Sequence, residues 1–416
     1  MKGNKAAELL KTTFRSLQYR NFRLFWCGQC ISVAGTWIQR TAQTWLVYSV
    51  TNSPLLVGLV GVAQFLPMLF LSLFAGVVAD RFPKQKLLVL TQSLFMAQAA
   101  AMTLLTATGL IRYWHILLLS FLFGLTQTLD MPARQAFFID LVGPENVTNA
   151  ISLNSTIVNL ARIVGPALAG LMMAKLGTAA CFGINAVSYL PVIMGILMIR
   201  VHETARPARS ANMLPEIADG LRYIRRNRTL VANVLIMAAV CTFAYNVSVI
   251  VPVFAREVLG MGVNGYTGLL SAEGVGAFSA ALLMAYRSKD GVKKPLLLLS
   301  GAGTAAAQIA TVFSHQFASS AFLFVFIGFF NLIFLNTANS IYQVSSSNEY
   351  RGRVMSVYSF LNMGSTPIGN FLAGAVMEKA GGDSGFVFCG CMALALLAAI
   401  AAAQHREISR WFRRGS

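Results

Sequence analysis

Four charged residues interrupt the long apolar stretches of this chain, and they define its most distinctive chemistry. They are Arg40, Asp130, Arg162 and Glu273. A charge near the centre of a bilayer costs about 2.5–3.5 kcal/mol on insertion scales, so each of these residues is a candidate for function. A carboxylate in such surroundings can take up and release a proton. We therefore predict that Glu273, Asp130 and Arg162 take part in proton coupling.

Two of these charges also have other interpretations. Asp130 could be a helix-end charge that pairs with Arg134 or Arg81 and serves only the packing of the helices. Arg40 lies near the same helical face as other polar residues of its stretch. That position favours a place on the wall of a substrate cavity over a purely structural role.

Uncharged polar side chains recur at helical spacing in several of the apolar stretches. The candidates for lining a substrate cavity are Arg40, Gln43, Asn159, Asn246, Asn336, Asn339 and Asn362. Such groups can also hold helices together, at about 0.6 kcal/mol each. Because polar stripes occur at once on residues 152–175, 317–343 and 354–378, an aqueous path through the membrane explains them better.

No arrangement of residues in the sequence would support enzyme catalysis. The four histidines are scattered, and neither paired carboxylates nor a Gly-x-x-x-x-Gly-Lys-Ser/Thr phosphate-binding motif is found. The six cysteines have no histidine or acidic neighbours at metal-binding spacing. We therefore expect no enzyme, no ATP hydrolysis, no cofactor and no metal site. Any transport by this chain would draw on an ion gradient or be passive.

The composition places the chain among helical membrane proteins. Hydrophobic residues make up 56% and charged residues 12% of the chain, and the mean hydropathy is +0.63. A run of roughly 18 or more apolar residues predicts a membrane helix, and we find about twelve such runs. Because lipid offers the backbone no hydrogen-bonding partner, each run must bond internally as an α-helix. We predict an all-α protein with twelve transmembrane helices.

The net charge of +18 is a topology signal and does not indicate nucleic-acid binding. Lys and Arg concentrate in alternate loops, in the N-terminal segment, in the stretch 200–228 and in the C-terminal tail. The positive-inside rule therefore places both termini and the central stretch in the cytoplasm. An even number of membrane crossings follows.

A polar and basic linker, residues 201–228, divides the chain into halves. Apolar residues recur within it at helical spacing, which predicts an amphipathic helix lying against the membrane or the bundle. The two flanking sequences show a weak internal repeat. Ala169-Gly170 matches Ala373-Gly374, and each of the two stretches holds a proline near mid-span, Pro166 and Pro367. We predict one bundle of six helices in residues 1–200 and a second in residues 229–416.

A charged hairpin joins the second and third apolar runs. Its marker residues are Gly76, Asp80, Arg81 and Lys84. The pattern resembles the Gly-x-x-x-Asp-Arg-x-x-Arg/Lys signature of the major facilitator superfamily, which follows the second helix of those transporters. The resemblance implies a conformational latch. The plainer alternative is a solvated turn whose positive charge only marks the cytoplasmic side.

Further motifs resemble the exporter branch of that superfamily that includes enterobactin and macrolide efflux proteins. They are Arg20-Asn21-Phe22-Arg23, Met131-Pro132-Ala133-Arg134, Ala161-Arg162-Ile163-Val164-Gly165-Pro166 and Tyr350-Arg351-Gly352-Arg353-Val354. The resemblance implies a major facilitator fold of two six-helix bundles in a bacterial inner membrane. It also implies export of a siderophore, drug or other small amphipathic molecule by alternating access, driven by proton influx. Small molecules, protons and the bilayer are thus the expected partners of a monomeric protein.

In that fold the helices that carry Arg162 and Glu273 meet across the domain interface. We therefore predict that these two residues pair and that proton binding to Glu273 loosens a gate, with a static ion pair as the alternative. A lipid or lysophospholipid flippase is a second possibility for the function. A non-transporting receptor or scaffold is a third, although it would not need charges inside the membrane.

Overall fold

The apolar runs form α-helices, and no strand occurs in the described residues, which are 14–200, 213–287, 291–347 and 349–414 of the computed structural model. The first helices in chain order are η1 (Arg15–Gln18), α2 (Arg20–Thr51), α3 (Pro54–Arg81), α4 (Lys84–Ala107), α5 (Tyr113–Val142), α6 (Val147–Leu176) and α7 (Thr178–Met198). The others are α8 (Met213–Arg226), α9 (Arg228–Phe243), α10 (Val247–Val253), the π-helix η2 (Phe254–Val258), α11 (Val263–Tyr286), α12 (Pro295–Val312), α13 (Phe317–Val344), α14 (Arg351–Ala380), α15 (Ser384–Ala403) and α16 (His405–Arg414).

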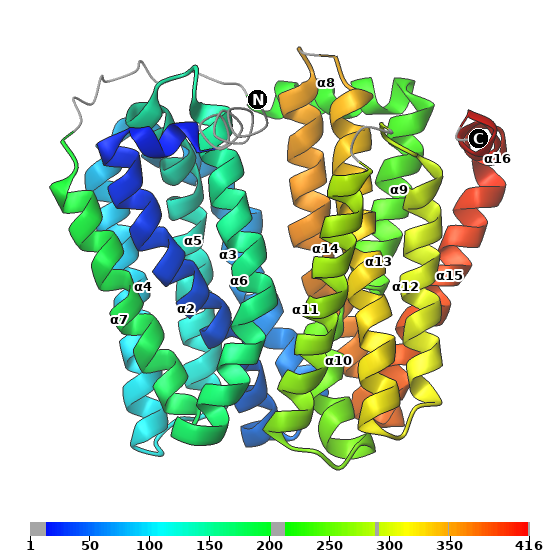
Figure 1. Ribbon diagram of the computed structural model, residues 1–416, viewed down its shortest axis with the longest axis horizontal. Coiled ribbons are helices and arrows are strands. Elements are labelled where there is room, and N and C mark those ends of the chain that lie inside the picture. The colour runs from blue at the N-terminus through cyan, green and yellow to red at the C-terminus, as the bar shows by residue number, and fades with distance from the viewer. Residues whose placement is uncertain (1–13, 201–212, 288–290, 348, 415–416) are drawn as a thin grey trace, which may run out of the picture. The chain divides into compact units, whose positions relative to one another are not determined.

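Within the described ranges, ten helical segments are long and apolar enough to cross a membrane. The helices α2 and α14 have 32 and 30 residues, more than the roughly 20 that a bilayer requires. They are not among the ten, because polar residues such as Arg40 in α2 and Asn362 in α14 lower the hydropathy of both helices. Together these segments correspond one for one to the predicted spans (Figure 1).

Contacts between residues group the helices into two compact units. The first unit comprises residues 1–43 and 66–209, and the second comprises residues 44–65 and 210–416. The hairpin between α2 and α3 therefore belongs to the second unit, although most of both helices belongs to the first. The division into bundles of six helices at residues 1–200 and 229–416 stays a prediction.

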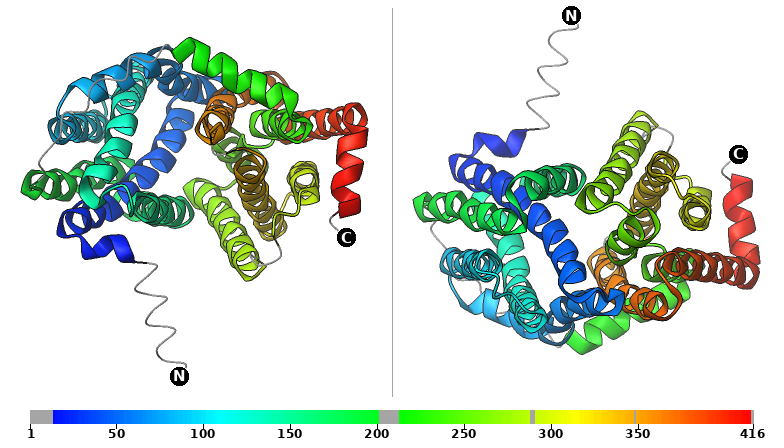
Figure 2. Two further views of the ribbon diagram at one scale, coloured as in Figure 1. Left: turned by 90° about the horizontal axis from the view of Figure 1, so that it is seen from above. Right: turned by 90° about the horizontal axis from the view of Figure 1, so that it is seen from below.

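Each unit has its own apolar core, and Figure 2 shows many of the surrounding helices nearly end-on. In the first unit, Phe22 and Phe25 of α2 pack edge-on against Phe137 and Phe138 of α5, with Phe25 and Phe138 5.7 Å apart between ring centres. In the second unit the core joins α9, α12, α13 and α15, and its members include Leu230, Phe334 and Leu397.

Two of the observed spans have features that the sequence analysis did not predict. In the fourth span, α5 continues through Pro132 to Val142. The buried residues Phe137 and Phe138 follow Pro132, and their packing offsets the one backbone hydrogen bond that a proline removes. The end of α5 is instead set by Gly143, whose positive φ of 75° suits a residue without a Cβ.

The seventh span is interrupted, which the sequence prediction missed. Between α9 and α10 the side chain of Asn246 donates to the carbonyl oxygens of Thr242 at 2.8 Å and Phe243 at 3.3 Å. A side chain that hydrogen-bonds its own backbone competes with the helix. The break therefore follows from local chemistry.

Two short amphipathic helices lie at the end of the second unit where α9 begins (Figure 1). The helix α8 confirms the one predicted in the linker. It docks through Tyr223, which stacks on Tyr350 at 4.4 Å between ring centres. The helix α16 was not predicted, and Trp411 buries it against the core of the unit.

Candidate functional site

Glu273 lies at mid-length of α11 and is half-buried. Asn331 of α13 donates its side-chain amide to a carboxylate oxygen of Glu273 at 3.5 Å. Thr304 of α12 in turn donates to the amide oxygen of Asn331 at 3.1 Å, and Tyr245 donates to its backbone carbonyl at 2.6 Å. These contacts join Glu273 to a chain of polar groups that crosses the core of the second unit.

Close packing of α11 on α13 holds the backbone of Glu273 in place. A Cβ added at Gly328 would overlap the carbonyl oxygen of Glu273, and one added at Gly276 would overlap the carbonyl oxygen of Val325. Small residues permit such approach between membrane helices. Gly276 and Gly328 thus let α11 and α13 approach each other closely.

Asp130 of α5 is buried in a saturated polar cluster within the first unit. One carboxylate oxygen accepts from Thr91 at 2.7 Å and from Gln92 at 2.8 Å. The other accepts two bonds from the Arg134 guanidinium, at 2.6 and 2.9 Å. Arg134 also donates to Gln29 of α2. The pairing of Asp130 with Arg134 is confirmed, while its role in proton coupling stays a prediction.

Arg40 of α2 and Arg162 of α6 meet at one aromatic ring. Each guanidinium carbon lies 5.3 Å from the centre of the Trp37 ring, within the range of a cation–π interaction. Both arginine side chains are exposed, and Trp37 is half-buried. The structure thus brings together two residues that were predicted for different roles. The predicted pair of Arg162 with Glu273 would join the two units and stays a prediction.

Two glutamines of α2 bond to neighbouring helices of the first unit. Gln39 donates to Gln98 of α4 at 3.0 Å and accepts from Asn185 of α7 at 2.7 Å. Gln43, predicted to line the cavity, donates to Ser120 of α5 at 2.9 Å and is half-buried. These side chains hold helices of the first unit together, which is the alternative that polar stripes allow.

The predicted cavity residues divide by exposure. Asn159 and Asn336 are exposed, and Asn339 and Asn362 are half-buried. Asn246 is fully buried at the break between α9 and α10, where its amide also contacts the Cys389 sulfur at 3.2 Å. In this conformation Asn246 shapes the backbone, whereas the other four are open to water to some degree.

The signature hairpin runs from the end of α3 to the start of α4. Gly76 is half-buried and Arg81 is exposed, while the Asp80 side chain lies outside the described residues. Lys84 is nearly buried, and its ammonium group lies 3.4 Å from a carboxylate oxygen of Asp140 on α5. The proposed latch therefore includes an ion pair within the first unit.

Two polar contacts in the second unit were not predicted from the sequence. Tyr48, near the end of α2, donates its hydroxyl to Glu257 of η2 at 2.5 Å. Ser53, in the turn before α3, donates to Glu378 of α14 at 2.7 Å. The residues of each pair lie more than 200 positions apart, so no periodicity or spacing pointed to them.

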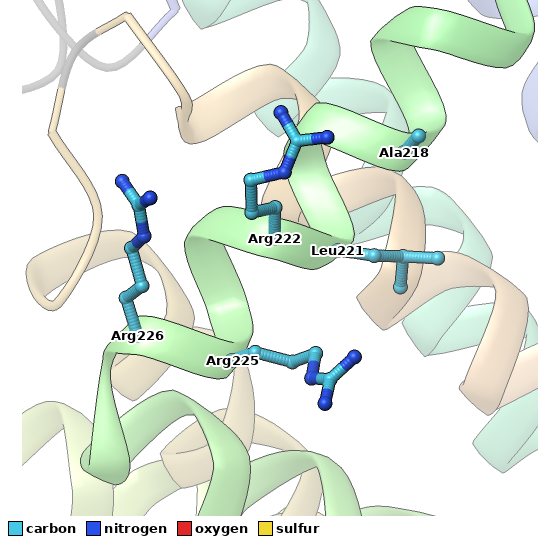
Figure 3. A pocket seen from close by; sticks show the side chains of 5 residues that line it. All are labelled: Ala218, Leu221, Arg222, Arg225 and Arg226. Atoms are coloured by element: carbon cyan, nitrogen blue, oxygen red, sulfur yellow. The ribbon is translucent and has the colours of Figure 1, made fainter.

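A shallow pocket on α8 offers no convergent site. Ala218, Leu221, Arg222, Arg225 and Arg226 line it. Figure 3 shows the three guanidinium groups pointing in different directions. Exposed arginines beside a leucine on a short amphipathic helix are typical of helices that lie at a membrane surface. We therefore assign the pocket no part in substrate binding.

Comparison with known proteins identifies the family. Residues 11–411 match the transmembrane secretion effector family. The chain belongs to that family. The match spans nearly the whole length and confirms the resemblance to major facilitator exporters. It also places the chain among transporters, not enzymes.

The curated relatives of this transporter are efflux-type proteins. It is 25% identical to the staphyloferrin A transporter of Staphylococcus aureus over 84% of this chain and 88% of that one. It is 26% identical to the multidrug efflux pump Tap of Mycolicibacterium fortuitum, covering 84% and 87% of the two chains. Identity with macrolide efflux protein A of Streptococcus pyogenes is 21%, covering 91% and 96%.

Solved structures confirm the fold. A bacterial homologue of the human lysosomal transporter Spinster, crystallised in an inward-facing and unoccupied conformation, gives a TM-score of 0.70 at 15% identity, covering 95% of this chain and 98% of that one. The nucleoside transporter NupG gives 0.71 at 11% identity, covering 93% and 98%. The chain is therefore an all-α, multi-pass membrane transporter of the major facilitator superfamily.

Proposed function

We propose that this transporter exports a small amphipathic molecule by alternating access, and that proton influx through Glu273 drives the export. The observation that carries the proposal is the half-buried carboxylate of Glu273 inside a membrane-spanning helix, 3.5 Å from the Asn331 amide. Burial favours the neutral acid and exposure to water favours the carboxylate. A conformational change that alters water access to Glu273 would therefore bind and release a proton.

The hairpin between α2 and α3 supplies contacts that such a change can make and break. Its bonds from Tyr48 to Glu257 and from Ser53 to Glu378 are few and polar. The backbones also approach closely, because a Cβ added at Gly374 would lie 2.6 Å from the Pro54 carbonyl oxygen. Contacts of this kind can separate without exposing a large apolar surface, as a reversible gate requires.

The efflux relatives support export as the direction, and the basic loops support a cytoplasmic location of both termini in a bacterial inner membrane. On this topology, Arg81 and Lys84 face the cytoplasm and act as the latch on that side. Substitution of Asp80 by Asn is then expected to impair transport. Full transport by Asp80→Asn would remove the latch from the mechanism.

The test is proton movement by the purified transporter in proteoliposomes that hold a pH-sensitive dye. We expect addition of a transported compound to produce a proton signal in the wild type and not in Glu273→Gln. Glu349→Gln, a matched change at an exposed loop carboxylate, should keep the signal. A signal that survives in Glu273→Gln would exclude Glu273 as the proton site. Compound movement without any proton signal would favour a uniporter or a lipid flippase.

A further inference from the structure

Two arginines, Arg40 and Arg162, contact the indole ring of Trp37. The guanidinium carbons of Arg40 and Arg162 are each 5.3 Å from the ring centre, so the two charges are no further apart than twice that distance. Both side chains are exposed although both helices span the membrane. Two exposed arginines on one aromatic ring form a compact positive site within the first unit.

Helix packing fixes this arrangement. Gly165 lies one turn after Arg162 on α6, and a Cβ added there would lie 2.6 Å from the Cβ of Trp37. The absence of a side chain at this position lets α6 approach α2 and brings Arg162 over the indole ring. Within one sequence motif, Gly165 thus permits the close approach of the helices and Arg162 supplies the charge over the ring.

The site has a positive electrostatic character. The guanidinium groups of Arg40 and Arg162 each lie 5.3 Å from one ring centre, so their like charges repel each other. An anion entering between the two guanidinium groups would relieve their repulsion.

We propose that Arg40, Trp37 and Arg162 bind the oxyanion of an organic acid, and that the apolar part of the acid lies on the indole face. Each guanidinium presents paired N–H donors that match the two oxygens of a carboxylate. The ring contributes apolar contact area beside the charge. The substrate class is therefore amphipathic organic acids rather than cations or neutral compounds. That this ligand is also the exported substrate rests on the proposed function.

The test uses three ligands of one shape and different charge, namely 4-phenylbutyrate, 4-phenylbutyramide and 4-phenylbutylamine. Binding to the full chain in phosphatidylcholine nanodiscs is measured by isothermal titration calorimetry. We expect the carboxylate to bind at least tenfold more tightly than the amide, and the amine to bind more weakly than either. Equal affinities for the carboxylate and the amide would overturn the proposal.

Single substitutions test which residues bind the carboxylate. Arg40→Gln and Arg162→Gln should each weaken carboxylate binding about tenfold, as loss of one charged hydrogen-bonding partner predicts, and leave amide binding unchanged. Lys175→Gln removes an exposed cation from the same helix as Arg162 and should leave both affinities unchanged. Equal losses for the carboxylate and the amide would mean general damage to the site and would overturn the assignment.

A lipid phosphate offers the same chemistry as a free acid, so nanodiscs with phosphatidylglycerol provide a second arm. Carboxylate affinity that is unchanged in these nanodiscs supports a soluble ligand, and loss of binding would reassign the site to a lipid headgroup. These measurements need no transport. If vesicles show no export while charge-selective binding persists, the proposed function fails and the anion site stands.

Discussion

The cluster around Asp130 allows a quantitative prediction about the first unit. Replacing Asp130 with Ala removes four hydrogen bonds, two from Arg134 at 2.6 and 2.9 Å and one each from Thr91 and Gln92 at 2.7 and 2.8 Å. The substitution also leaves the Arg134 charge without its carboxylate partner. Breaking a buried ion pair in this way costs about 3–5 kcal/mol.

We expect a loss near the lower end of that range, about 3 kcal/mol, because an arginine that keeps some contact with water is easier to leave unpaired. The Arg134 side chain is 19% exposed and the Asp130 side chain 5%. Arg134 also keeps its hydrogen bond to Gln29 and its position over the Phe25 ring at 5.9 Å.

The assay follows the reactivity of a buried cysteine on heating in detergent. Cys181 belongs to the first unit and is fully buried, so a thiol-reactive dye labels it only when that unit opens. With the other cysteines replaced, Asp130→Ala should lower the temperature at which Cys181 reacts. Asp140→Ala, which removes a looser 3.4 Å contact to Lys84, should lower it less.

A double variant separates loss of the ion pair from loss of packing. Asp130→Ala with Arg134→Leu removes the stranded charge, so it should recover part of the stability that Asp130→Ala loses. An unfolding temperature equal to the wild type for Asp130→Ala would refute the reasoning. So would a double variant whose loss equals the sum of the two single losses.

Three further predictions concern the second unit. Gly328→Ala should destabilise it by about 1–3 kcal/mol because the methyl group would overlap the Glu273 carbonyl oxygen. The reactivity of buried Cys241 on heating measures the loss. Gly352→Ala, where an added Cβ meets open space, should not lower the stability of the unit. For Glu407 of α16, burial works to raise the carboxyl pKa, but hydrogen bonds from Thr229 and Trp411 and the charges of Lys294 and Arg410 outweigh it and hold the pKa below its usual value. The docking of α16 should therefore be at full strength above about pH 4.3 and weaken as the pH falls further, with hydrogen exchange of α16 as the readout and no such loss expected in Glu407→Gln. Tyr48→Phe should speed labelling of a cysteine placed at Asn52 in the hairpin because the bond to Glu257 is lost, and labelling at the wild-type rate would mean that this bond does not restrain the hairpin.

The sequence predicted the features that depend on local pattern. Long apolar runs gave the membrane helices, and the spacing of apolar residues in the linker gave α8. The partner of Asp130 was also within reach, because Arg134 lies four residues further along the same helix. Each of these features can be deduced from residues that are close together in the chain.

The features that were missed depend on which helix lies next to which. Periodicity places Gln39 and Arg40 on the polar side of α2, yet Gln39 bonds to Gln98 and Asn185 whereas Arg40 is exposed. Adjacent helical positions point about 100° apart, so one residue meets neighbouring helices and the next meets water. The sequence alone does not show which helices pack beside α2.

The polar contacts also show that the two carboxylates within the spans are held differently. Asp130 accepts four bonds of 2.6–2.9 Å, including two from a cation. Through Arg134 and Gln29 these bonds belong to a cluster that joins α2, α4 and α5. The bond from Asn331 to Glu273 is long at 3.5 Å and comes from a neutral amide, which can remain beside either form of the acid. The Asn331 bond to Glu273 is thus longer than any of the four bonds to Asp130, and proton exchange at Glu273 stays a prediction.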